Sequence, residues 1–132
     1  MTDTVHTVTA GAVTDTAVRV CDLTQLTPDL GVAALIGDTQ VALFLLADGA
    51  LYAVQNLDPF SHASVISRGI TGSKGDIPTI ASPIYKQVFS LITGECLVTM
   101  DKAPKPGNEP NLVTYPVAVD NGQVYIDLAG GL

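Results

Sequence analysis

Apolar residues along this chain fall into short runs, each bounded by residues that favour turns. The run at 32–36 is separated from the run at 40–46 by a three-residue turn signal, and Asp48-Gly49 then leads into residues 50–55. Asp-Gly and Asn-Gly pairs tolerate the positive φ angles that a tight hairpin turn requires. No segment keeps a helical period over three turns. The pattern therefore predicts antiparallel strands joined by hairpins.

Two later pairs of runs follow the same rule, 87–92 with 95–99 and 112–119 with 123–128. In the last run Val124, Ile126 and Leu128 alternate with polar residues, as expected of a strand with one buried face. About three strong hairpins predict an all-β domain, an antiparallel β-sandwich or barrel.

Several segments do not fit the hairpin pattern. Residues 56–75 form a long stretch rich in Ser and Gly whose apolar side chains predict that it packs onto the core. Residues 101–110 contain three prolines and predict a solvated loop, and residues 82–86 interrupt two strand-like runs. Short helical turns are expected in loops near residues 23–26 and 64–68.

Composition and charge narrow the choice of function. The chain has 132 residues, enough for one domain, and it is 47% hydrophobic and 14% charged, which excludes wholesale disorder. Six Lys and Arg against 13 Asp and Glu give a net charge of −7, and the basic residues are scattered singly. Nucleic-acid binding needs a basic stripe, so we expect no nucleic-acid partner.

The termini and the most apolar stretch indicate where the chain resides. Residues 1–17 contain six Thr and no aromatic residue, which predicts a disordered tail ahead of a single domain at 18–132. The tail lacks the basic start and apolar run of a signal peptide. The stretch 31–50 is interrupted at its centre by polar residues and is not a membrane span. The sequence thus predicts a cytoplasmic protein without membrane contact.

Side chains with catalytic or metal-binding chemistry are few. Cys21 and Cys96 lie far apart, and in a cytoplasmic protein we expect two free thiols. Two isolated histidines do not make a zinc site, which needs three or four convergent ligands. Ser61 and His62 are adjacent, but neighbouring side chains of an extended segment point in opposite directions, so His62 is expected to be an exposed loop residue. We therefore expect no catalytic residue and no metal ligand in this chain.

Two of the irregular segments carry the prolines and spacing of a known pair of loops. Residues 56–60 read NLDPF and residues 82–85 read SPIY, while residues 89–94, FSLITG, follow the pattern F-D-L-x-T-G. In this order they resemble the two cluster-binding loops of a Rieske domain, which read Cys-x-His and Cys-x-x-His. The resemblance implies a Rieske-like all-β fold.

The resemblance also extends to one branch of that family. The order of Asp58-Pro59-Phe60, the later residues 67–69 (SRG), and the segment 81–89 is similar to the small subunit of assimilatory NAD(P)H-dependent nitrite reductases. The similarity covers about residues 18–128. It implies a subunit of a cytoplasmic enzyme that reduces nitrite to ammonium with electrons from NADH or NADPH.

All four cluster-ligand positions of the Rieske pattern have changed here. Asp58 and Ser82 stand where the cysteines would be, and Phe60 and Tyr85 stand where the histidines would be. A [2Fe–2S] Rieske centre needs two thiolates and two imidazoles, so we expect no iron in this chain. Phe60 and Tyr85 are expected to fill the vacated volume. Asp58 is expected to accept hydrogen bonds from backbone N–H groups and from the Tyr85 hydroxyl.

The resemblance implies a division of labour within the enzyme. FAD, iron–sulfur and sirohaem groups are expected in a large subunit, and this chain alone is expected to be inactive and to support or dock on that partner. The candidate docking residues are at the tip of the two loops: Phe60, Ser61, His62, Tyr85 and Lys86. Phe60 and Tyr85 can equally be core plugs. The alternatives are a Rieske-type [2Fe–2S] electron carrier and a stand-alone binding module.

Overall fold

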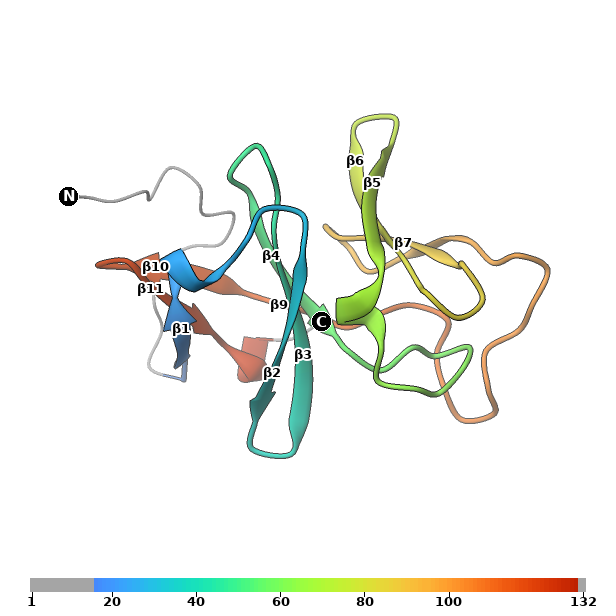
Figure 1. Cartoon of the computed structure of the whole chain (residues 1–132). Coiled ribbons are helices and arrows are strands. Elements are labelled where there is room, and N and C mark those ends of the chain that lie inside the picture. The colour runs from blue at the N-terminus through green and yellow to red at the C-terminus, as the bar shows by residue number, and fades with distance from the viewer. Residues whose placement is uncertain (1–15, 131–132) are drawn as a thin grey trace.

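Three antiparallel sheets make up the part of the chain that the structure, a computed structural model, describes, namely residues 16–130 (Figure 1). The strands are β1 (Val18–Asp22), β2 (Gly31–Ile36), β3 (Thr39–Leu45), β4 (Leu51–Gln55), β5 (Ile70–Lys74), β6 (Ile77–Ala81), β7 (Val88–Ser90), β8 (Cys96–Val98), β9 (Thr114–Tyr115), β10 (Val117–Asp120) and β11 (Gln123–Ile126). Their orders are β1-β11-β10, β2-β3-β4-β9 and β5-β6-β7-β8. The predicted all-β class is confirmed.

Within the described residues, helical structure is confined to short 3-10 turns: η2 (Leu23–Gln25), η3 (Ile66–Arg68) and η4 (Leu128–Gly130). The first two of these fall at the predicted helical turns. Among residues 16–130 there is no helix with the length and apolar character needed to cross a membrane.

The sheet β2-β3-β4-β9 is the middle layer, with one hydrophobic cluster on each of its faces (Figure 1). Strand β3 shows why: Val41 and Leu43 belong to the cluster shared with β10 and β11, whereas Ala42 and Phe44 belong to the cluster shared with β6 and β7. Successive side chains of a strand point to opposite faces, so a continuous apolar run is buried on both sides. The middle sheet thereby joins the two outer sheets.

The hairpins follow the sequence pattern except at Pro116. Strands β2, β3 and β4 pair in the predicted order, and β10 pairs with β11 around Asn121-Gly122. The run predicted as one strand at 112–119 is two: β9 pairs with β4, and β10 pairs with β11 in another sheet. Proline has no N–H to donate, so the ladder is interrupted at Pro116 and the chain changes sheets there.

Part of the long stretch 56–75 is a strand that the sequence analysis did not predict. Strand β5 pairs with β6 along its whole length, from Ile70 opposite Ala81 to Lys74 opposite Ile77. It is an edge strand whose side chains are largely exposed. Exposed Gly, Ser and Lys do not produce the alternation by which a strand is recognised, because no face of β5 is fully buried.

The predicted tail is described at its last two residues only, since residues 1–15 lie outside the described part. Thr16 donates a hydrogen bond from Oγ1 to Asp127 Oδ1 at 2.7 Å. Thr16 thus contacts the domain through Asp127, while the predicted boundary at residue 18 stays a prediction.

Both cysteines are free, as the sequence predicted, and both are half-buried. Burial is the main cause that raises the pKa of the Cys21 thiol and that of the Cys96 thiol. The thiolate is the nucleophile, so a raised pKa slows the reaction with disulfide reagents.

We expect both thiols to react with dithionitrobenzoate at pH 8 more slowly in the native protein than in urea. Equal rates in the two conditions would contradict the burial of these groups.

Candidate functional site

A six-residue loop at 58–63 follows strand β4 and closes on itself. The Asp58 N–H donates to the Ala63 carbonyl at 2.8 Å, and the His62 N–H donates to the Asp58 carbonyl at 2.7 Å. Within the loop, Asp58 Oδ1 accepts from the Phe60 N–H at 2.9 Å. Neighbouring residues in the chain are enough to form such a turn. Proline restricts its own φ and favours an extended conformation of the preceding Asp58, and a short Asp side chain can accept a hydrogen bond from the backbone N–H two residues later.

A second loop at 82–87 repeats this construction. The Ser82 N–H donates to the Gln87 carbonyl at 2.9 Å, and Ser82 Oγ accepts from the Ile84 N–H at 3.3 Å. Proline again occupies the second position, and the fifth residue of each loop has a positive φ, 62° at His62 and 68° at Lys86. We call residues 58–63 and 82–87 the twin loops.

The twin loops are joined by their first residues. Ser82 Oγ donates to Asp58 Oδ2 at 2.5 Å, and both side chains are fully buried. A buried carboxylate needs hydrogen-bond donors, and Asp58 has them in the Ser82 hydroxyl and the backbone N–H groups of Phe60 and Ser61. The predicted backbone donors are thus present. The predicted donor Tyr85 is not among the hydrogen-bond partners described for Asp58, so that part of the prediction is wrong.

Phe60 is the plug that the sequence analysis expected. Its side chain is 2% exposed and belongs to the cluster between the middle sheet and β6–β7. Its ring lies 6.2 Å from the Phe89 ring, centroid to centroid, at an interplanar angle of 54°. This tilted arrangement is favourable for two aromatic rings.

Tyr85 is not a core plug, and that half of the prediction is wrong. Its side chain is 38% exposed, and Lys102 Nζ lies 4.6 Å from the centre of its ring. In the twin-loop register Phe60 corresponds to Ile84, which is exposed, and Tyr85 lies one residue further along, so no residue of the second loop takes the buried place that Phe60 has in the first. The hydroxyl of Tyr85 therefore has no need of a buried partner.

A third loop, 99–110, is largely exposed, as predicted for residues 101–110, and it also packs against the first twin loop. The Lys105 N–H donates to the Pro59 carbonyl at 2.9 Å, and Asn108 Nδ2 donates to the same carbonyl at 3.0 Å. Asn108 Nδ2 also lies 3.0 Å from His62 Nδ1. His62 is exposed, as predicted, and its ring contact is with Asn108 and not with Ser61. The prolines in the sequence indicated that this segment is a loop, but they did not indicate that it contacts the first twin loop.

The donor chemistry at the four ligand positions does not fit a [2Fe–2S] cluster. A Rieske centre requires two thiolates and two imidazoles. Here the side chains of Asp58 and Ser82 are hydrogen-bonded to each other. Phe60 provides a hydrocarbon ring, and Tyr85 provides an exposed phenol. Across residues 16–130, no three His, Cys, Asp or Glu side chains gather where they could hold a metal ion.

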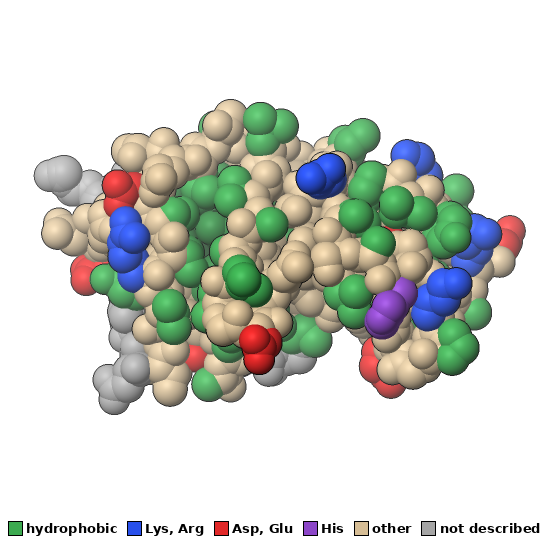
Figure 2. Space-filling view, turned by 60° about the horizontal axis from the view of Figure 1, so that its bottom comes forward, with side chains coloured by type: hydrophobic (Ala, Val, Ile, Leu, Met, Phe, Trp, Pro, Cys, Tyr) green, Lys and Arg blue, Asp and Glu red, His purple; other side chains and the backbone are tan. Residues whose placement is uncertain are grey.

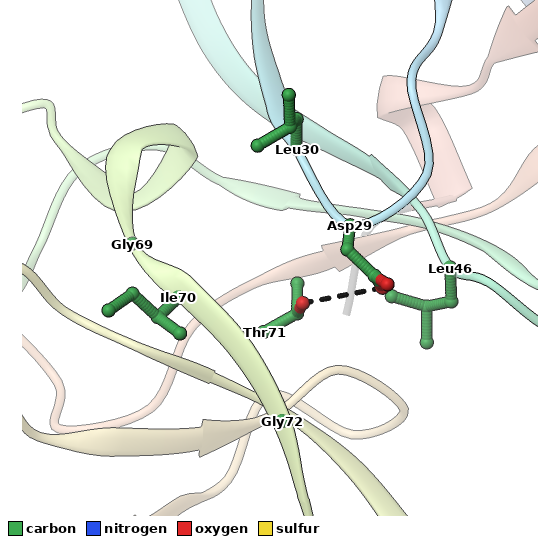
Figure 3. Close-up of a pocket in the computed structure, with 7 residues that line it drawn as sticks. All are labelled: Asp29, Leu30, Leu46, Gly69, Ile70, Thr71 and Gly72. Carbon is green, nitrogen blue, oxygen red and sulfur yellow. Dashed lines mark hydrogen bonds between the residues drawn. The ribbon is translucent and has the colours of Figure 1, made fainter.

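Apart from the twin loops, a surface pocket of about 480 Å³ lies between the start of β2 and strand β5 (Figure 3). Asp29 provides its one carboxylate, and Oδ1 accepts a weak hydrogen bond from Thr71 Oγ1 at 3.4 Å. Leucine, isoleucine and glycine make up the rest of the lining. A pocket with one titratable group offers no acid–base or nucleophile pair, so the twin loops remain the candidate site.

Comparison with known proteins identifies similar sequences and structures. Residues 16–127 match the Rieske-like [2Fe-2S] domain family. The NADH nitrite reductase small subunit of Escherichia coli K12 is 39% identical over 79 residues, covering 59% of this chain and 73% of that protein. A crystal structure described as a putative NADH-dependent nitrite reductase small subunit from Mycobacterium tuberculosis is 41% identical, with a TM-score of 0.71 over 83% of this chain and 92% of that one.

A large subunit also matches. The NAD(P)H nitrite reductase large subunit of Klebsiella oxytoca is 38% identical over 108 residues, which cover 81% of this chain. The matched segment is 10% of the length of that large subunit.

Proposed function

Because this chain belongs to the nitrite reductase small-subunit family of Rieske-like domains, we propose that it is a non-catalytic subunit of a cytoplasmic NAD(P)H-dependent nitrite reductase. The complex would reduce nitrite to ammonium in nitrate assimilation. FAD, iron–sulfur and sirohaem groups of the large subunit would carry electron transfer and reduction. Cofactors supply such chemistry, so a subunit without them contributes binding, orientation or stability.

The observation that carries this proposal is the hydrogen bond between Ser82 and Asp58. It joins the two residues that, by the resemblance, stand at the cysteine positions of a Rieske domain, and both side chains are fully buried. The buried Phe60 ring occupies the adjoining volume. These residues support the proposal that the chain keeps the fold of an electron-transfer domain but takes no part in electron transfer.

The match within the Klebsiella oxytoca large subunit supports the choice of partner. A segment of that chain is similar to this one, so a domain of this kind occurs there covalently joined to a large subunit. We propose that this chain makes the corresponding contact as a separate polypeptide. The exposed docking candidates are Tyr85, Lys86 and His62, with Ser61 beside them, whereas buried Phe60 supports the loop from beneath.

Co-expression with a candidate large subunit tests the proposal. We expect the two chains to co-purify, and we expect NADH- or NADPH-driven loss of nitrite to fall when this chain is omitted. The chain alone should consume no nitrite. If the large subunit assembles and reduces nitrite equally well when this chain is omitted, the assignment is overturned and a stand-alone module is favoured.

Iron content tests the absence of a cluster. Purified alone under anaerobic conditions, the chain is expected to be colourless and to contain no iron above the buffer level by atomic emission. Because Asp58 and Ser82 stand in place of the two cysteines, no thiolate is present there to hold iron. Iron in a stoichiometric amount, with a visible absorption band, would instead make the chain an electron carrier.

A further inference from the structure

Backbone strain is concentrated at one end of the molecule. Six residues other than glycine have a positive φ among residues 16–130, and four of them lie in the twin loops or the third loop. They are His62, Lys86, Met100 and Asp101, with φ between 58° and 68°. This conformation is unfavourable for residues with a Cβ, and such residues cluster at functional sites when the surroundings hold them in place.

Basic residues are concentrated at the same end. Three of the six Lys and Arg residues of the chain are Lys86, Lys102 and Lys105, on the second and third loops. The carboxylate of Asp58 is buried, and Asp101 and Glu109 are the exposed acids of the three loops. Figure 2 shows basic side chains to one side of the histidine and above it, acidic side chains below it and at the edge, and hydrophobic side chains among them. The chain as a whole carries −7, so this end differs in charge from the rest.

Exposed apolar side chains belong to the same loops. Ile84, Tyr85 and Met100 are 45%, 38% and 49% exposed. Lys102 lies against the face of the Tyr85 ring, and Lys86 Nζ donates to the Pro83 carbonyl at 3.0 Å, so two of the lysines are held beside the apolar group. An apolar centre with a polar rim is the arrangement of a protein–protein interface, and tyrosine is enriched at such centres.

We propose that the third loop completes the docking face and that this face binds an acidic surface of the partner, with carboxylates placed around an apolar depression. The docking face consists of Ile84, Tyr85 and Met100 at the centre and of His62, Lys86, Lys102 and Lys105 at the rim. The proposal rests on the function proposed above, and it adds the third loop and the charge of the partner. The contacts of Lys105 and Asn108 with Pro59 hold the third loop in the same face as the twin loops.

The two parts of the face have different kinetic roles. Exposed rim charges act at long range, so they accelerate association and their effect declines as salt shortens the Debye length. The apolar centre is desolvated only in the complex, so it determines the dissociation rate. Binding of the partner should therefore weaken with salt even though this chain has a net negative charge.

Surface plasmon resonance with the purified large subunit tests the proposal. The charge-reversal variant Lys102→Glu/Lys105→Glu is expected to slow association about tenfold or more at low salt, with little change in dissociation. The variant Met100→Ser is expected to speed dissociation about severalfold, with association unchanged. Raising NaCl from about 50 to about 500 mM should reduce the difference in association rate between the charge variant and the wild type.

The matched control is Arg68→Glu/Lys74→Glu, which makes the same change in net charge on two exposed basic residues outside the three loops. It should change the association rate less than about threefold. If both double variants slow association equally, net charge alone is responsible and the proposed face is wrong. If the wild type binds and the Lys102→Glu/Lys105→Glu variant binds equally well, the proposed docking face is also wrong. Absence of wild-type binding would instead overturn the function proposed above. Far-UV circular dichroism melting verifies that each variant is folded.

Discussion

Replacing Phe60 by Ala is expected to lower the free energy of unfolding by about 3–5 kcal/mol. The side chain is 2% exposed and packs on Phe89 in the cluster that joins the middle sheet to β6 and β7. Truncation removes a ring from this cluster and leaves a cavity that the two sheets cannot close. Domains of this size are stable by about 5–15 kcal/mol, so the loss is a large part of the total. Urea unfolding followed by circular dichroism measures it.

Two variants make this result specific. Phe60→Leu keeps most of the volume and should cost less than about 1.5 kcal/mol. Tyr85→Ala removes an exposed ring and its contact with Lys102, worth about 1 kcal/mol or less. If Phe60→Ala were no more destabilising than Tyr85→Ala, the assignment of Phe60 as the plug would be wrong.

Replacing Asp58 by Ala is expected to destabilise the domain by about 3 kcal/mol. The Ser82 hydroxyl and the Phe60 N–H would both lose their acceptor in a site that water does not reach. A buried donor left unpaired costs about 1–3 kcal/mol, and hydrogen bonds to a charged group are the stronger ones. The twin loops would also lose the bond that joins them. Hydrogen exchange at the Phe60 N–H should accelerate more than global unfolding predicts, because the loop opens locally.

Asp58→Asn separates the hydrogen bonds from the charge. The amide oxygen can still accept from the Phe60 N–H, while the amide nitrogen faces Ser82 Oγ, which can accept in place of donating. We expect a cost of about 1 kcal/mol. Asp38→Ala, at an exposed turn between β2 and β3, is the control and should stay within about 0.5 kcal/mol of the wild type. A stability of Asp58→Ala within that same range would mean that the buried bond contributes nothing.

The loops show most clearly which features could be predicted from the sequence and which could not. The prolines and spacing at residues 58–60 and 82–85 predicted two loops of one kind, and the structure shows the twin loops with matching closing bonds. The resemblance also placed Asp58 and Ser82 at corresponding positions. Nothing in the sequence showed that Ser82 donates to Asp58, because that bond joins residues 24 apart in the chain.

Local chemistry is what the sequence by itself determined. Turn residues with positive φ fixed the hairpins of β2–β3–β4 and β10–β11, and prolines fixed the form of the twin loops. These features depend on neighbours in the chain, so a local pattern is enough to predict them.

Tertiary packing decided the rest. It divided one predicted strand between two sheets at Pro116, buried Phe60 while leaving Tyr85 exposed, and placed the third loop against Pro59. Each of these depends on a surface or a hydrogen-bond partner that is distant in the chain. Which of two similar aromatic side chains is buried depends on the volume available beneath it, and that volume exists only after the sheets have packed together.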